Sequence, residues 1–301
     1  MNTASPDLLH ELSTALAARV ASAAPLIVAL GAGHRPRTGL LWRADAIVAS
    51  EQALPERDRF TVTLAGGAPA EARLAGRDRG TNVAVLRLDP PAPFTAPSRA
   101  AEPQVGALVL ALGADGSGGA TARLGLVRRL GPAWHSQAGG RIDRLIGLDM
   151  ALSAGEEGGP VLDAAGGLLG ISTLGPHRRV LVIPCATIER VLEPLLSHGR
   201  VERGWLGIGV QPVGLPEELR AATGREVGLM VVSLVKGAPA ALAGAMQGDI
   251  LLDLNGQPVA HRRAIAAALH ESSVGQVITL RVLRAGVVQT LSATIAARPP
   301  R

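Results

Sequence analysis

Short apolar segments, divided by glycine, proline and charged residues, follow one another from about residue 25 to residue 191. Residues 26–30, 46–48 and 83–88 are examples, and each is too short and too rich in aliphatic residues for a surface helix. Many short strands at close spacing are typical of an all-β barrel or sandwich. The 37 glycines and 21 prolines fit this organisation, because both residues are common in tight turns. The pattern then predicts a closing helix over residues 184–196.

The segment before this β-rich region has a helical pattern. Pro6 and Asp7 suit a first turn, and the following leucines and valine, Leu8, Leu12, Leu16 and Val20, recur every four residues. We therefore expect an N-terminal helix over residues 6–24. Its apolar stripe must pack against the rest of the chain or against another subunit.

A short polar linker at residues 197–203 separates the β-rich region from a second unit at about 204–297. This unit begins with an expected strand at 205–210 and contains the tight-turn pair Asn255-Gly256. The sequence thus predicts three parts: an N-terminal helix at 1–24, a β domain at 25–198 and a second domain at 203–298.

Composition argues against several functional classes. The net charge is +5, but the arginines are scattered singly or in pairs and aromatic residues make up only 2% of the chain, so we do not expect nucleic-acid binding. Cys185 is the single cysteine, which excludes an intramolecular disulfide and a cysteine-based metal site. We find no metal-ligand spacing, and the glycine-rich run at 113–119 lacks the lysine and threonine of a phosphate-binding loop. We therefore expect no metal and no cofactor.

The N-terminal segment bears on location. It lacks the basic region and long apolar core of a signal peptide, and Asp7 and Glu11 stand where positive charge is usual. Residues 23–30 are too few to span a bilayer and include Pro25. These observations predict a cytoplasmic protein without a membrane span, or a periplasmic or cell-envelope protein if the true start lies upstream.

The second unit resembles a PDZ domain. The resemblance rests on residues 203–208, 237–240, 244–251 and 255–259. PDZ domains bind peptide tails by adding a strand to an open sheet edge beside a helix. The resemblance implies that the backbone N–H groups of Leu206, Gly207 and Ile208 hold a terminal carboxylate and that Ile265 and Leu269 line the side-chain pocket. Trp205 is also expected to belong to this peptide-binding site. The alternative is that this domain only packs against the first one.

With a PDZ-like domain after it, the β-rich region resembles the protease domain of the HtrA (DegP/DegS-like) family. Residues 38–54 resemble the segment that carries the family histidine, residues 81–88 the segment of the aspartate, and residues 149–171 the nucleophile loop and its hairpin. Residues 181–184 resemble the strand before the closing helix. The resemblance implies a mostly β fold, in which a chymotrypsin-like double β-barrel precedes an α+β PDZ domain.

The chain departs from this family at the catalytic triad. Gln52 stands at the histidine position, Asn82 at the aspartate position and Glu157 at the serine position. A glutamine amide cannot take up a serine proton, an asparagine carries no charge to stabilise an imidazolium, and a carboxylate is a poor nucleophile toward an amide. The oxyanion loop is retained, because Gly155 and position 157 still offer backbone N–H groups.

Two orientations are open for the Glu157 side chain at this stage. Its carboxylate can fold back onto the N–H groups of the oxyanion loop and close the site to carbonyl groups. It can also point to solvent from a loop that has lost its catalytic role.

The sequence therefore predicts a catalytically inactive HtrA-like protein that acts as an adaptor or regulator. Its expected partners are C-terminal tails of proteins or peptides, or an active protease relative. An active serine endopeptidase in protein quality control, with a misassigned or partner-completed catalytic site, is the alternative. A third class is a structural subunit of a homo- or hetero-oligomer assembled through the N-terminal helix.

Overall fold

The computed structural model describes residues 8–31, 36–269 and 274–299. The expected helix start at Pro6 and Asp7 lies outside these residues. The described chain divides into two units, one made mainly of residues 8–201 and one made of residues 202–299 with the short segment 135–141. Each unit is described by itself below.

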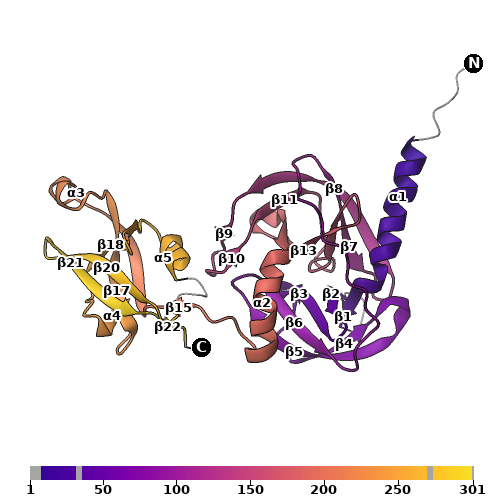
Figure 1. Ribbon diagram of the computed structural model, residues 1–301, viewed down its shortest axis with the longest axis horizontal. Helices are drawn as coiled ribbons and strands as arrows, with labels where there is room; N and C mark the ends of the chain where they lie inside the picture. Colours follow the sequence, from indigo (N-terminus) through magenta and orange to yellow (C-terminus); the bar gives the residue numbers. More distant parts are fainter. Residues whose placement is uncertain (1–7, 32–35, 270–273, 300–301) are drawn as a thin grey trace, which may run out of the picture. The chain divides into compact units, whose positions relative to one another are not determined.

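The first unit contains two closed six-stranded barrels, as the sequence predicts (Figure 1). Strands of the first barrel run in the order β1-β2-β3-β6-β5-β4, and those of the second in the order β11-β14-β13-β12-β7-β8. The bounds in the first barrel are β1 Ile27–Leu30, β2 Arg37–Arg43, β3 Ala46–Ser50, β4 Arg59–Thr63, β5 Pro69–Asp78 and β6 Val83–Leu88. Those in the second are β7 Leu108–Ala114, β8 Ala120–Gly131, β11 Leu145–Asp149, β12 Pro160–Asp163, β13 Leu168–Leu174 and β14 Val180–Pro184, and the short strands β9 Trp134–His135 and β10 Arg141–Ile142 pair with each other.

Each barrel has an interior of alternating inward-facing aliphatic residues. Phe60 and Ile47 are fully buried in the first barrel, and Val161 is fully buried in the second. A third cluster joins the two barrels to helix α2 (Cys185–His198), whose Ile188 and Val191 are completely buried. The closing helix thus covers a seam that both barrels share, and this fixes the loops at that seam.

Helix α1 (Leu8–Ala23) precedes the barrels and is only partly packed against them. Leu16 and Val20 lie against the shared core, whereas the side chains of Leu8 and Leu12 are 74% and 39% exposed. The described structure therefore buries only the C-terminal half of the predicted apolar stripe against the chain itself. The helix is 16 residues long, and none of the described helices has the length and apolar character needed to cross a membrane.

The second unit is a twisted sheet in the order β16-β17-β18-β20-β21 with short helices. Its elements are β15 Gly204–Trp205, β16 Ile208–Gly214, α3 Glu217–Thr223, β17 Val227–Leu234, α4 Pro239–Leu242, β18 Ile250–Leu254, β19 Gln257–Pro258, α5 Arg262–Ala268, β20 Val277–Arg284, β21 Val287–Thr294 and β22 Ala296–Ala297.

The prediction of a single strand at 205–210 is wrong. The chain makes two strands there, β15 and β16, because Gly207 takes a φ of +75° that an extended strand does not allow. This break turns the backbone out of the sheet at the start of β16.

Candidate functional site

The three residues at the triad positions of the resemblance come together at the seam between the barrels. Gln52 lies in a 3-10 turn (Glu51–Ala53) after β3, Asn82 in the turn before β6, and Glu157 in the loop before β12. The Gln52 backbone N–H donates to Asn82 Oδ1 at 2.8 Å, and Gln52 Nε2 donates to Glu157 Oε1 at 2.5 Å. Asn82 has a φ of +57°, a conformation that asparagine adopts more readily than most residues. Residues far apart in sequence are thus joined by direct hydrogen bonds.

The Glu157 side chain takes neither of the two orientations considered from sequence. It is 5% exposed, so it does not point to solvent. Its Oε1 atom accepts hydrogen bonds from Ser50 Oγ at 2.9 Å, Thr173 Oγ1 at 2.8 Å and the Leu174 backbone N–H at 3.1 Å, in addition to Gln52 Nε2. All four donors are uncharged. The carboxylate therefore fills the space between the triad positions, not the donor nest of its own loop.

The remaining amide groups complete this network. Asn82 Nδ2 donates to Ser50 Oγ at 2.9 Å and to Thr173 Oγ1 at 2.7 Å, and Gln52 Nε2 also donates to the Leu174 carbonyl at 2.8 Å. Sequence reasoning missed Ser50 and Thr173. The available signal was weak: both are fully or nearly buried hydroxyls near the ends of mainly apolar strands. The network links a β3 residue of one barrel to a β13 residue of the other.

The loop that carries Glu157 is held by its neighbour Glu156. The Glu156 carboxylate accepts from Arg123 Nε at 2.9 Å and from the Ser153 backbone N–H at 2.7 Å. Burial raises the pKa of Glu156, but these hydrogen bonds lower it more, so the pKa lies below its ordinary value. The side chain is buried, and its carboxyl group is ionised at neutral pH. This ion pair fixes the shape of the loop.

The oxyanion part of the loop keeps its donors. Within the part of the chain that the structure describes, the backbone N–H groups of Gly155 and Glu157 make no hydrogen bond. Thr38 Oγ1 donates to the Gly155 carbonyl at 2.7 Å and so orients this peptide unit. Gly158 has a φ of +94°, and a Cβ there would lie 2.6 Å from the Thr38 carbonyl oxygen, so only glycine fits. Two N–H groups therefore stay available to a negatively charged oxygen.

The peptide-binding residues implied by the PDZ resemblance also lie together, around a cavity of about 200 Å³ in the second unit. Trp205, Ile208, Ile265 and Leu269 line this cavity, together with Leu206 and Gly207. A Cβ on Gly207 would lie 2.1 Å from the Cβ of Ala238, so the turn before β16 requires glycine in space as well as in φ. β16 is the terminal strand of its sheet, so an added strand can pair with its free edge.

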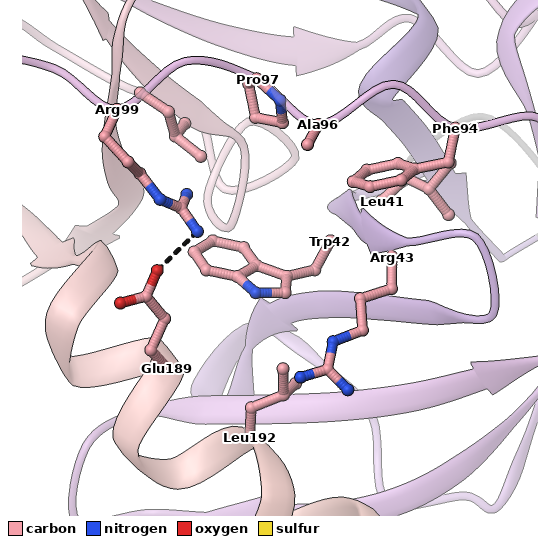
Figure 2. Close-up of a pocket in the computed structure, with 10 residues that line it drawn as sticks. Leu41, Trp42, Arg43, Phe94, Ala96, Pro97, Arg99, Glu189 and Leu192 are labelled. Carbon is pink, nitrogen blue, oxygen red and sulfur yellow. Dashed lines mark hydrogen bonds and ion pairs between the residues drawn. The ribbon is translucent and has the colours of Figure 1, made fainter.

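A separate hollow in the first unit lies beside Trp42, between β2, the segment before β7 and helix α2 (Figure 2). The Arg99 guanidinium lies 4.5 Å from the centroid of the Trp42 ring, and its Nη2 atom is 2.6 Å from Glu189 Oε1. The stacked arginine and its ion pair attach the segment between the barrels to α2. We interpret this hollow as structural, because the two arginines that line it, Arg43 and Arg99, are already ion-paired with Glu193 and Glu189.

Cys185 lies beside this arginine at the start of α2. Its Sγ atom accepts from Arg99 Nη1 at 3.4 Å and donates to the Leu168 carbonyl at 3.3 Å. Burial raises the pKa of the thiol to about 11, so it is protonated at neutral pH and is a poor nucleophile. Among the described residues there is also no group of three or more histidine, cysteine, aspartate and glutamate side chains that could bind a metal ion.

Comparison with known families matches residues 37–171 to the trypsin-like peptidase domain and residues 204–295 to the PDZ domain. The chain is an HtrA-type protein. The first match covers Gln52, Asn82 and Glu157, and the second covers the whole cavity-lining turn before β16 together with α5.

The curated relatives of this chain include bacterial proteins. A probable periplasmic serine endoprotease DegP-like of Brucella suis is 31% identical over 264 residues, which cover 84% of this chain and 50% of the relative. The protein with the same description from Chlamydia trachomatis is 27% identical over 270 residues, covering 87% of this chain and 54% of the relative. The chain thus spans about half the length of the curated relatives it matches. The prediction of a cytoplasmic location is wrong by this comparison, since these relatives are described as periplasmic.

Solved structures of the same type match almost the whole chain. The HtrA-type protease AlgW with a decapeptide superposes with a TM-score of 0.75 at 26% identity, covering 95% of this chain and 99% of AlgW. The serine endoprotease from Yersinia pestis gives a TM-score of 0.73 at 25% identity, covering 93% and 97% of the two chains. The predicted fold class, a chymotrypsin-like double barrel followed by a PDZ domain, is confirmed.

Proposed function

We propose that this HtrA-type protein does not hydrolyse peptide bonds and that it acts as an adaptor or regulator that binds C-terminal tails through its PDZ domain. We place it in the periplasm with its relatives. The observation that carries the proposal is the environment of Glu157 Oε1, which accepts four hydrogen bonds from uncharged donors where a serine protease needs a reactive oxygen.

The chemistry of the three side chains supports inactivity. Peptide hydrolysis in this fold requires a base that takes the nucleophile's proton and returns it to the leaving amine. Gln52 has no basic nitrogen, and its Nε2 acts as a donor to Glu157 and to the Leu174 carbonyl. Without the triad, the oxyanion donors and substrate binding retain roughly 10³–10⁴-fold enhancement over water, far below that of a protease.

The second unit supports the binding role. An open edge at β16 lies next to a cavity lined by apolar side chains of α5 and of the preceding turn. The AlgW structures that match this chain were solved with a decapeptide and with a tripeptide. A tail that adds a strand to β16 can place its terminal carboxylate at the backbone N–H groups of Leu206, Gly207 and Ile208, and its last side chain against Ile265 and Leu269.

The competing function is an active serine endopeptidase, which the names of the curated relatives favour. Casein cleavage separates the two. We expect no cleavage by the wild-type protein, and cleavage by the triple variant Gln52→His/Asn82→Asp/Glu157→Ser. The matched control is Gln52→His/Asn82→Asp/Glu157→Ala, which lacks a nucleophile and should be silent. Cleavage by wild-type protein that survives repurification, with labelling by a serine-directed fluorophosphonate, would refute the proposal.

The binding role has its own test. Fluorescent peptides with a free terminal carboxylate should bind the full chain, and the same peptides with an amidated C-terminus should not, because the amide removes the charge that the turn before β16 would hold. Equal binding of both forms would contradict recognition of a chain terminus.

A further inference from the structure

A cavity of about 530 Å³ lies in the first unit beside the C-terminal half of α1. This volume is within the range of about 300–1,000 Å³ that is usual for small-molecule sites. Its walls are formed by α1 with the 3-10 turn that follows it (Ala24–Leu26), by residues 93–98, and by β12 with the turn after it. Phe94, Ala96 and Pro97 also line the hollow beside Trp42, so this segment forms a wall of both hollows (Figure 2).

The floor of the cavity is apolar. Leu26 and Leu162 are buried and belong to the core that both barrels share, and Phe94 packs against the same core. The walls also contain three prolines, whose nitrogens carry no hydrogen to donate, namely Pro25, Pro93 and Pro97. The inner part of the cavity therefore suits an apolar group.

The mouth of the cavity carries one charged group. Arg19 is exposed and is the only charged residue among the described residues that line the cavity. Within the part of the chain that the structure describes, its guanidinium makes no hydrogen bond and no ion pair. A Cβ on Gly166 would lie 2.9 Å from Arg19 Cδ, so the aliphatic stem of the arginine lies directly over this glycine of the cavity wall. A positive charge without a counter-ion thus lies beside an apolar floor.

These features define the chemistry of a ligand. A guanidinium binds a carboxylate through two parallel N–H···O hydrogen bonds, and the hydroxyl groups of Ser22, Thr95 and Ser98 in the lining can donate to the same anion. Arg19 repels a cationic ligand, and an uncharged ligand leaves the guanidinium without an anion. A single arginine suits a single negative charge. The apolar floor favours an alkyl chain, because burial of CH₂ groups is favourable.

We propose that this cavity binds a medium-chain fatty acid, with the carboxylate on Arg19 and the alkyl chain against Leu26, Phe94 and Leu162. The site is separate from the triad positions and from the PDZ cavity, which share none of its lining residues. Since α1 is only partly packed against the barrels, a ligand between Arg19 and Phe94 adds contacts that hold the helix to them.

The test is isothermal titration calorimetry of the full chain with decanoate, 1-decanol and decyltrimethylammonium, each below its micelle concentration or solubility limit. We expect one saturable site, at which decanoate binds about five- to tenfold more tightly than decanol, as a charge-assisted hydrogen bond provides. Decyltrimethylammonium should bind most weakly. Octanoate should bind about tenfold more weakly than decanoate, because it buries two fewer CH₂ groups.

Substitutions assign the effect to this cavity. Arg19→Gln should bind decanoate and decanol within about twofold of each other, and Arg19→Lys should keep part of the preference. Arg73→Gln, at an exposed arginine of β5 outside the cavity, removes an equal charge and should leave the preference unchanged. Ser22→Trp, at an exposed position of the wall, should fill the cavity and weaken both ligands while the unfolding midpoint stays near that of the wild-type protein.

Three results would overturn this inference. The first is the absence of saturable decanoate binding. The second is equal binding of decanoate and decanol, or a preference for decanoate that survives Arg19→Gln. The third is displacement of decanoate by a decapeptide with a free terminal carboxylate, which would place the fatty acid in the PDZ cavity.

Discussion

Replacing Glu157 by alanine tests whether the buried carboxylate organises the seam between the barrels. The substitution removes the acceptor of four hydrogen bonds. Gln52 Nε2 keeps the Leu174 carbonyl, and the hydroxyls of Ser50 and Thr173 can turn, but the Leu174 backbone N–H is left without its acceptor. A buried N–H group that loses its hydrogen-bond acceptor costs about 1–3 kcal/mol of stability. Loss of the acceptor for the Leu174 N–H, together with the partly compensated losses at the Ser50 and Thr173 hydroxyls, should lower the free energy of unfolding by ~2–5 kcal/mol.

The assay is thermal unfolding of the full chain, followed by circular dichroism with the unfolding step of the barrel unit analysed separately from that of the PDZ domain. For a domain of this size, the expected loss lowers the barrel midpoint by about 5–15 °C. Glu157→Gln keeps an acceptor oxygen and should cost less, about 1–2 kcal/mol. Glu56→Ala, at a side chain that is 83% exposed, is the matched control and should shift the midpoint little. If Glu157→Ala and Glu56→Ala have the same midpoint, the network does not stabilise the seam.

Three further predictions test other parts of the structure. Burial raises the pKa of Asp249, but hydrogen bonds from Arg284 and the Met246 backbone lower it more. This carboxylate therefore contributes stability above about pH 4 that is lost as pH falls through its lowered pKa. In acid titrations, the free energy of unfolding of the PDZ domain should therefore depend less on pH in Asp249→Asn than in the wild-type protein. Gly207→Ala forces a Cβ into a strained turn against Ala238 and should destabilise the PDZ domain and abolish tail binding, as measured by its unfolding midpoint and anisotropy. Trp42→Ala should lower barrel stability by about 3–5 kcal/mol in denaturant titrations, whereas Glu189→Ala, at a half-exposed ion pair, should change it by less than ~1 kcal/mol.

The fold could be predicted from sequence because its signal is local and repeated. Short apolar segments between turn residues predict strands, and most expected strands lie within a few residues of the observed ones. The pairing of β1 with β4, which closes the first barrel, leaves no such local signal, and the family resemblance implied only that a double barrel forms. The error at 205–210 also reflects a missing local signal: the run looks like one strand, and the positive φ of Gly207 that breaks it is not evident from the neighbouring residues.

The candidate site could be predicted in its positions but not in its contacts. Gln52, Asn82 and Glu157 were aligned through the family pattern, and in the structure they are joined by hydrogen bonds. The partners Ser50 and Thr173 could not be found, because a serine 107 residues before the glutamate meets it only when both barrels have closed. Sequence reasoning also missed the hydrogen bond from Arg262 Nε to the Val210 carbonyl oxygen, because it joins helix α5 to strand β16, 52 residues away.

The three departures from the triad form one complementary set. Glu157 supplies only acceptors when ionised, and the amide of Gln52 supplies the donor that faces it at 2.5 Å. Asn82 donates to Ser50 and Thr173, which leaves both hydroxyl hydrogens free to point at the same carboxylate oxygen. An aspartate at position 82 would offer those hydroxyls a second acceptor and place another negative charge near Glu157. A serine at position 157 would leave the other donors unmatched. Each of these three residues is therefore favourable only in the presence of the other two. For this reason the variant designed to restore peptide hydrolysis changes all three positions at once.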